Sequence, residues 1–170
     1  MEVFYQYTTI FFVLSTAKAE PLIFKSRQQD QSMRVFVILG EEVLKFEEPL
    51  IRLLRACFGA NDVSQEYLWF VVTEGRELVG CASVDIEENR LWNLCVVKHH
   101  RRRGVARVLL REVVKRFPRI KLYVERGNVG ARRLYSRMHF IETEKTDWMV
   151  DMVHAPPIYN FYEQSVVQIA

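Results

Sequence analysis

The chain has 170 residues, which is enough for one domain with a substantial hydrophobic core. Apolar residues make up 49% and charged residues 26%, as in ordinary globular domains, and a formal net charge of +3 is too small to indicate nucleic-acid binding by itself. The three cysteines are widely spaced and form no Cys-x-x-Cys pair, which argues against a disulfide framework and a zinc site and favours a reducing, cytoplasmic compartment.

The N-terminal residues 1–32 form an extension with mixed signals. Ile10 to Leu14 is apolar, and Ala17-Lys18-Ala19 resembles a small-x-small cleavage site, but no Lys or Arg precedes the apolar run. The run is also far shorter than the roughly 20 residues of a membrane span. We expect an added edge strand or an unpacked extension, with a targeting segment as the alternative.

Hydrophobic periodicity from Met33 onward predicts the order β-α-β-β-β-α-β-α-β-β, a mixed α/β architecture. Pro49 is expected to break or kink the first helix, and Gly59 to end it. The final hairpin has a very short turn near Lys145. The predicted strands are 33–39, 68–73, 78–84, 91–97, 120–125, 140–144 and 148–153, and the predicted helices are 41–58, 105–117 and 128–138.

The strongest chemical signal is the sequence VVKHHRRRGVA at 96–106, which leads into an amphipathic helix. Gly104 permits a close turn, and the amides of 102–106 lie at a helix N-terminus, where unpaired donors and the helix dipole favour an anion. A pyrophosphate would suit this positive turn. The alternative is a solvated Arg-rich turn, and spacing alone does not separate the two.

The pattern Arg101-x-x-Gly104-x-Ala106 after an apolar strand resembles the acyl-CoA pyrophosphate loop of the GNAT superfamily. Downstream, Asn128-x-x-Ala131-x-x-Leu134-Tyr135 followed by Phe140 resembles the second signature of that family. The resemblance covers roughly 33–154 and implies the GNAT fold, a mixed and mostly antiparallel central sheet flanked by helices. The domain would then be 33–154, followed by a C-terminal tail at 155–170.

The resemblance implies that this domain binds acetyl-CoA through three segments. The loop would hold the pyrophosphate by backbone amides, the preceding strand would hold the pantetheine arm and polarise the thioester carbonyl, and the second signature would contact the pantetheine. The implied residues are Asn93, Leu94, Cys95, Val96 and Val97 on the strand, Arg101, Arg102, Arg103, Gly104, Val105 and Ala106 in the loop, and Asn128 and Ala131 in the second signature.

The resemblance also implies that Tyr135 protonates the departing CoA thiolate. A thiol has a pKa of about 8.5 and a phenol of about 10, so a proton transfer coupled to thiolate release is plausible chemistry. On periodicity alone, Tyr135 would be a core aromatic. Tyr123 is the first candidate to help deprotonate the acceptor amine and Glu125 is its rival, while both could equally be ordinary sheet positions.

Two positions depart from the family pattern. His139 replaces the usual glycine before Phe140, where the helix ends in the left-handed conformation, which histidine enters more readily than most residues. Lys98 replaces a frequent proline. Cys95 could be imagined as an acyl-carrying nucleophile, but a lone strand cysteine is more often a small hydrophobe.

The expected function is therefore direct transfer of an acetyl group from acetyl-CoA to a primary amine on a protein N-terminus, a lysine, a polyamine or a small molecule. The alternative is a catalytically inactive acyl-CoA sensor or scaffold, and a nucleic-acid-binding module is disfavoured because the arginines lack interleaved aromatics. We expect no metal, no nucleic acid and no membrane among the partners, and either a monomer or a homodimer.

Overall fold

The computed structural model describes residues 22–24, 33–59 and 63–156. These residues form two units divided between Val113 and Val114, within one helix, and each unit is described by itself. The first unit contains, in chain order, β1 (Leu22–Phe24), β2 (Met33–Ile38), the 3-10 helix η1 (Gly40–Phe46), α2 (Glu47–Phe58), β3 (Leu68–Glu74), β4 (Glu77–Asp85), β5 (Arg90–Val96), the 3-10 turn η2 (Lys98–His100) and the start of α3 (Val105–Arg116).

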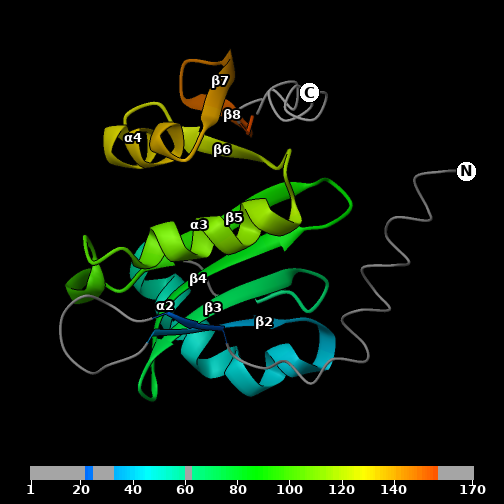
Figure 1. Ribbon diagram of the computed structural model, residues 1–170, viewed down its shortest axis with the longest axis vertical. Helices are drawn as coiled ribbons and strands as arrows, with labels where there is room; N and C mark the ends of the chain where they lie inside the picture. The colour runs from blue at the N-terminus through cyan, green and yellow to red at the C-terminus, as the bar shows by residue number, and fades with distance from the viewer. Residues whose placement is uncertain (1–21, 25–32, 60–62, 157–170) are drawn as a thin grey trace, which may run out of the picture. The chain divides into compact units, whose positions relative to one another are not determined.

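The first unit is built on an antiparallel sheet with strands in the order β1-β2-β3-β4-β5 (Figure 1). β3 is buried along its whole length, because both faces of the sheet are covered. One face packs against α2 through Leu50, Leu53 and Leu54, which join Trp69 and Cys81 in the hydrophobic core. This packing fixes the middle of the sheet.

On the opposite face of the sheet, α3 packs against β4 at Gly80. A Cβ on Gly80 would lie 2.8 Å from Cγ1 of Val105 and 3.1 Å from the carbonyl oxygen of Cys95. Successive strand residues face opposite sides of a sheet, so Gly80 and the core residue Cys81 belong to different faces. The missing side chain therefore allows the first turn of α3 to approach β4 and β5 closely.

We expect Gly80→Ala to lower the free energy of unfolding by about 1–3 kcal/mol, the usual cost of overpacking a well-packed core. The added methyl group would have to displace Val105 or the β5 backbone. Urea denaturation would measure the change. Gly130→Ala is the matched control, since its nearest neighbour would be 3.9 Å away and helix propensity predicts a slight stabilisation. Equal stability of Gly80→Ala and the native chain would contradict this packing.

The first predicted helix is in fact two elements. A 3-10 segment ends at Phe46 and the α-helix begins at Glu47, so Pro49 neither breaks nor kinks the α-helix. Pro49 lies in the first turn of α2, where a backbone N–H has no intrahelical acceptor to lose. The predicted stop at Gly59 is confirmed: its φ is 70°, and its N–H donates to the carbonyl of Arg55.

The second unit contains the end of α3 and then β6 (Lys121–Glu125), α4 (Val129–Arg137), β7 (Phe140–Lys145) and β8 (Met149–His154) (Figure 1). β8 pairs antiparallel with both β6 and β7. Side chains alternate between the two faces along β6 and β8, so every second residue lies in the core. The buried residue of α4, Tyr135, also lies in this core. The buried residues from β6 to β8 are Leu122, Val124, Phe140, Val150, Met152 and His154.

β1 pairs with β2 in the register Leu22 to Val35 through Phe24 to Met33, so a short strand precedes the predicted domain. The apolar run Ile10 to Leu14, the cleavage-site pattern and most of the predicted tail at 155–170 lie outside the described residues. None of the helices in the described ranges has the length and apolarity that crossing a bilayer requires.

Candidate functional site

The strand predicted at 91–97 is observed as the continuous β5, but its pairing with β4 shifts register partway along. Cys95 pairs with Cys81 and Trp92 with Ser83, so Asn93 and Leu94 together oppose a single residue of β4. Asn93 has a φ of 51°, and its side-chain amide donates to Oγ of Ser83 at 3.0 Å. This is a β-bulge, which leaves one residue out of the ladder and turns the following backbone.

The arginine-rich loop is anchored to the end of β5 by its own first residue. Nε of Arg101 donates to the carbonyl oxygen of Val96 at 3.0 Å, and the N–H of His100 donates to the carbonyl of Val97 at 2.9 Å. The side chain of Arg101 is therefore used to hold the loop against the strand. The backbone N–H of Arg101 donates to the carbonyl oxygen of Lys98 at 3.3 Å, so the amide donors left for an anion are those that follow in the turn.

The turn itself adopts left-handed backbone conformations at Arg102, with φ 65°, and at Gly104, with φ 93°. α3 starts at Val105, so the amides that follow Gly104 are the first of the helix and have no intrahelical acceptor. Three basic residues spaced by four along α3 are exposed: Arg107, Arg111 and Lys115. The loop thus combines unpaired amide donors, a helix N-terminus and positive charge.

Glu74 is a buried carboxylate in contact with this loop, and the sequence analysis did not single it out. Its side chain is 4% exposed, lies within hydrogen-bond distance of Nε2 of His100 at 2.7 Å, and forms an ion pair with the guanidinium of Arg103 at 3.0 Å. These contacts hold His100, just before the loop, and Arg103, within the loop, to the end of β3. An acidic residue at a hairpin corner gives no sequence signal for this role, because both of its partners are distant in the sequence.

Glu74→Gln should lower the free energy of unfolding by about 1–3 kcal/mol, because the buried His100 ring nitrogen and the half-exposed guanidinium of Arg103 lose their charged acceptor. It should also weaken binding of an anion at the loop, since Arg103 is no longer held. Thermal denaturation and calorimetric titration with CoA would measure the two effects. Glu88→Gln, at an exposed turn, is the matched control and should change neither. Unchanged CoA binding in Glu74→Gln would show that the pairs only stabilise the fold.

The three cysteines gather beside the end of β5, from α2, β4 and β5. Sγ of Cys81 lies 3.6 Å from Sγ of Cys95, and all three thiols are free. Hydrogen bonding to Cys81 and burial raise the pKa of Cys95, and burial together with Cys95 raises the pKa of Cys57 to about 11. Thiols that stay protonated are poor nucleophiles, which argues against Cys95 as an acyl carrier.

Tyr135 is the buried residue of α4, with 8% of its surface exposed. Its ring packs against Phe140 with centroids 5.6 Å apart, and Phe140 in turn packs against His154. Burial raises the pKa of Tyr135 to about 12. The phenol therefore keeps its proton throughout the neutral and mildly alkaline range, as a general acid must.

Asn128 caps α4, since its Oδ1 accepts a hydrogen bond from the N–H of Ala131 at 3.1 Å. Asparagine is one of the residues that cap helix N-termini most readily, and this cap uses the side-chain oxygen. The amide group of Asn128 has two N–H donors besides this oxygen. At the other end of α4, His139 has a φ of 65°, so it occupies the left-handed position that the family usually gives to glycine.

Tyr123 and Glu125 project from the exposed face of β6, on either side of the buried Val124. Tyr123 is 39% exposed and pairs directly with Asp151 of β8, which puts the two side chains on the same face of the sheet. The sequence analysis did not consider Asp151. Only the strand register, which joins residues distant in the sequence, brings this carboxylate beside Tyr123.

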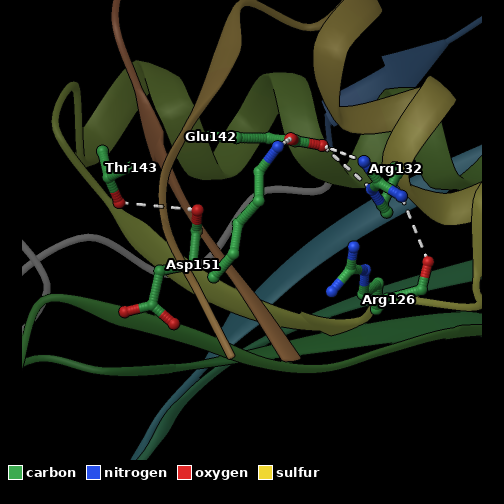
Figure 2. A network of polar contacts seen from close by, with 6 residues as sticks. Arg126, Arg132, Glu142, Thr143 and Asp151 are labelled. Atoms are coloured by element: carbon green, nitrogen blue, oxygen red, sulfur yellow. Dashed lines mark hydrogen bonds and ion pairs between the residues drawn. The ribbon is translucent and has the colours of Figure 1, made fainter. Parts of the chain in front are cut away.

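A second polar cluster links α4 to the β7–β8 hairpin (Figure 2). Arg132 donates to Glu142 at 2.6 and 2.9 Å and to the carbonyl oxygen of Arg126, and Lys145 pairs with Glu142 at 2.7 Å. Hydrogen bonds from Lys145 and Arg132 lower the pKa of Glu142. Figure 2 shows the carboxylate of Asp151 pointing away from this cluster, so Asp151 is not a member of it.

The family model of the GNAT acetyltransferases matches residues 32–140, and the chain belongs to this family. It is an acetyl-CoA-dependent acetyltransferase by that membership. No curated protein sequence matches the chain.

Solved structures of low sequence identity share the fold of this chain. The GNAT domain of S. lividans PAT has a TM-score of 0.61 and 14% identity, covering 78% of this chain and 95% of that one. Arabidopsis thaliana NAA60, solved with a bisubstrate analogue, has a TM-score of 0.54 and 20% identity over 70% and 96% of the two chains. The ribosomal-protein-S18-alanine N-acetyltransferase from Escherichia coli has a TM-score of 0.53 and 19% identity over 75% and 99%. The expected mixed, mostly antiparallel GNAT fold is confirmed.

Proposed function

We propose that this acetyltransferase moves the acetyl group directly from acetyl-CoA to a primary amine, with both substrates bound together. The observation that carries the proposal is the loop of residues 101–106, which presents its backbone amides at the start of α3 while Arg101 and Arg103 hold it to β5 and β3. A preformed set of amide donors loses little freedom when a pyrophosphate binds.

The bulged part of β5 supplies the second half of the donor site. Asn93 and Leu94 leave the ladder with β4, so the backbone of these two residues is available to hydrogen-bond the pantetheine arm at the start of the segment Asn93 to Val97. Farther along, Cys95 and Val96 pair with β4 again, and the N–H of Val97 donates to the carbonyl of Val79 at 3.0 Å. An amide of this segment polarises the thioester carbonyl and stabilises the oxyanion that forms when the amine attacks. Asn128 donates a further hydrogen bond to the pantetheine through its side-chain N–H groups, next to Ala131.

Tyr135 completes the reaction by giving its proton to the CoA sulfur as the carbon–sulfur bond breaks. The raised pKa of Tyr135 keeps the phenol protonated, so the donor is present in nearly every enzyme molecule at neutral pH. The amine attacks the thioester carbon, the tetrahedral intermediate collapses, and CoA leaves as the thiol. The amide product keeps the nitrogen that attacked.

The ammonium form of the acceptor must lose a proton before it can attack. Tyr123 receives or relays this proton, with Glu125 as the rival acceptor on the same face of β6. Asp151 strengthens the choice of Tyr123, because a carboxylate beside the phenol attracts the cationic amine and can take the proton that a neutral phenol cannot hold.

The acceptor is an exposed amine on a protein or a polyamine. The β7–β8 hairpin turns between Lys145 and Met149 and is closed by hydrogen bonds between Thr146 and Met149, so it is too short to form a long lid. Tyr123 and Glu125 are exposed on their own sheet face. Both features leave room for a large substrate.

An acceptor panel tests this proposal. Peptides with a free N-terminus, the same peptides with a blocked N-terminus and one lysine, spermidine and a small aminoglycoside would each be mixed with acetyl-CoA, and CoA release would be followed. Turnover with a peptide or polyamine is the expected result. Turnover with the small aminoglycoside alone would contradict the choice of a large acceptor.

A further inference from the structure

Two histidines and a glutamate meet where the start of β4 lies beside η2. Glu77, His99 and His100 each have a ligand atom within 4.8 Å of the others. Nε2 of His99 lies 3.3 Å from Oε1 of Glu77, and the rings of His99 and His100 are 4.3 Å apart between centroids. The side chains of Glu77 and His99 are about half exposed, whereas that of His100 is only 7% exposed.

His100 has an unusual hydrogen-bonding state. Its Nε2 is 2.7 Å from the carboxylate of Glu74, and an ionised carboxylate can only accept, so Nε2 carries the hydrogen. Its Nδ1 is buried and has no hydrogen-bond partner among the residues that the structure describes. Leaving a buried polar atom unpaired is costly, and such an atom in a folded protein usually has a ligand, a water or an ion as its partner.

With Nε2 protonated, Nδ1 of neutral His100 presents a lone pair, which is the form that binds a metal ion. The Glu74 carboxylate then plays the part of the outer-shell partner that fixes the tautomer and orientation of a ligating histidine. Imidazole nitrogens with one carboxylate oxygen suit a borderline cation such as Zn²⁺ better than Mg²⁺ or Ca²⁺, which prefer oxygen ligands.

We propose that Glu77, His99 and His100 form a binding site for a divalent transition cation such as Zn²⁺. Glu74 orients His100 by accepting a hydrogen bond from its other ring nitrogen. The site cross-links the start of β4 to the segment that follows β5. The cysteine spacing that argued against zinc in the sequence has no bearing on these imidazole and carboxylate ligands. The site lies just before the loop of 101–106 but uses other side chains.

Calorimetric titration of the full chain with ZnCl₂, after removal of metal with a chelator, tests the site directly and needs no acetyl-CoA. We expect one Zn²⁺ per chain with a dissociation constant in the micromolar range or tighter. His99→Ala and Glu77→Gln should each weaken binding at least about tenfold, the scale seen when a ligand or its supporting residue is lost. Both side chains are exposed, so these variants should fold like the native chain.

Two controls separate this site from other zinc-binding groups. His139→Asn removes an exposed histidine while keeping a residue suited to positive φ, and Glu87→Gln removes an exposed carboxylate; both should bind Zn²⁺ like the native chain. Absorption of the Co²⁺ complex shows whether thiolates bind, because thiolate ligands give a strong near-ultraviolet charge-transfer band. Lack of Zn²⁺ binding, unchanged binding in His99→Ala and Glu77→Gln, or a thiolate band would each overturn the proposal.

Discussion

Tyr135→Phe should lower kcat by about 10- to 1,000-fold while leaving the dissociation constant of acetyl-CoA almost unchanged. The substitution keeps the ring that packs on Phe140 and removes only the hydroxyl group. Turnover would be measured with saturating acetyl-CoA from about pH 7 to pH 10, which spans the amine and phenol pKa values. The defect should persist over this range, since the pKa of Tyr135 is raised to about 12 and the native phenol stays protonated throughout.

Tyr123→Phe is the matched comparison, because it makes the same chemical change on the exposed face of β6. Its defect should shrink as the pH rises, since more of the acceptor amine is already neutral and needs no help to lose a proton. Full activity of Tyr135→Phe at every pH would show that water or another group protonates the thiolate. A defect in Tyr123→Phe that does not change with pH would assign it a role in binding.

Gly104→Asp should weaken acetyl-CoA binding at least about tenfold, which corresponds to about 1.4 kcal/mol. The carboxylate would face the phosphates at a helix N-terminus, and an aspartate would also have to adopt the φ of 93° that Gly104 has. Titration calorimetry would measure the dissociation constant.

Gly104→Ala separates charge from backbone strain in this experiment. Its Cβ meets no protein atom within 4 Å, so it adds the strain of positive φ and a methyl group but no charge. We expect its affinity to lie between those of the native chain and Gly104→Asp. Equal affinity of Gly104→Asp and the native chain would place the pyrophosphate elsewhere.

The elements that position the site were predictable where the local sequence dictates them. Gly59 and His139 occupy the left-handed positions expected of helix ends, and Asn128 caps α4. Such features depend on a few neighbouring residues, so a single sequence carries the signal. The amphipathic helix that follows Gly104 was predictable for the same reason.

The contacts that shape the site depend on pairings between distant residues and were not predictable. The bulge at Asn93 exists only relative to β4, and its one local hint is that asparagine tolerates positive φ. Glu74 reaches the loop across a sequence separation of 29 residues, and Asp151 meets Tyr123 only through the register of β6 and β8. No periodicity in the sequence encodes these neighbours.

The most direct test of the proposed reaction is its stoichiometry. The chain would be mixed with acetyl-CoA and an amine that the acceptor panel identifies, and released CoA and N-acetylated amine would be quantified together by mass spectrometry. Direct transfer predicts one molecule of N-acetylated amine for each CoA released, no CoA release above background without the amine, and no acetyl group on Cys57, Cys81 or Cys95. CoA release that does not depend on the amine, or acetyl-CoA binding without any release across the whole panel, would contradict the account.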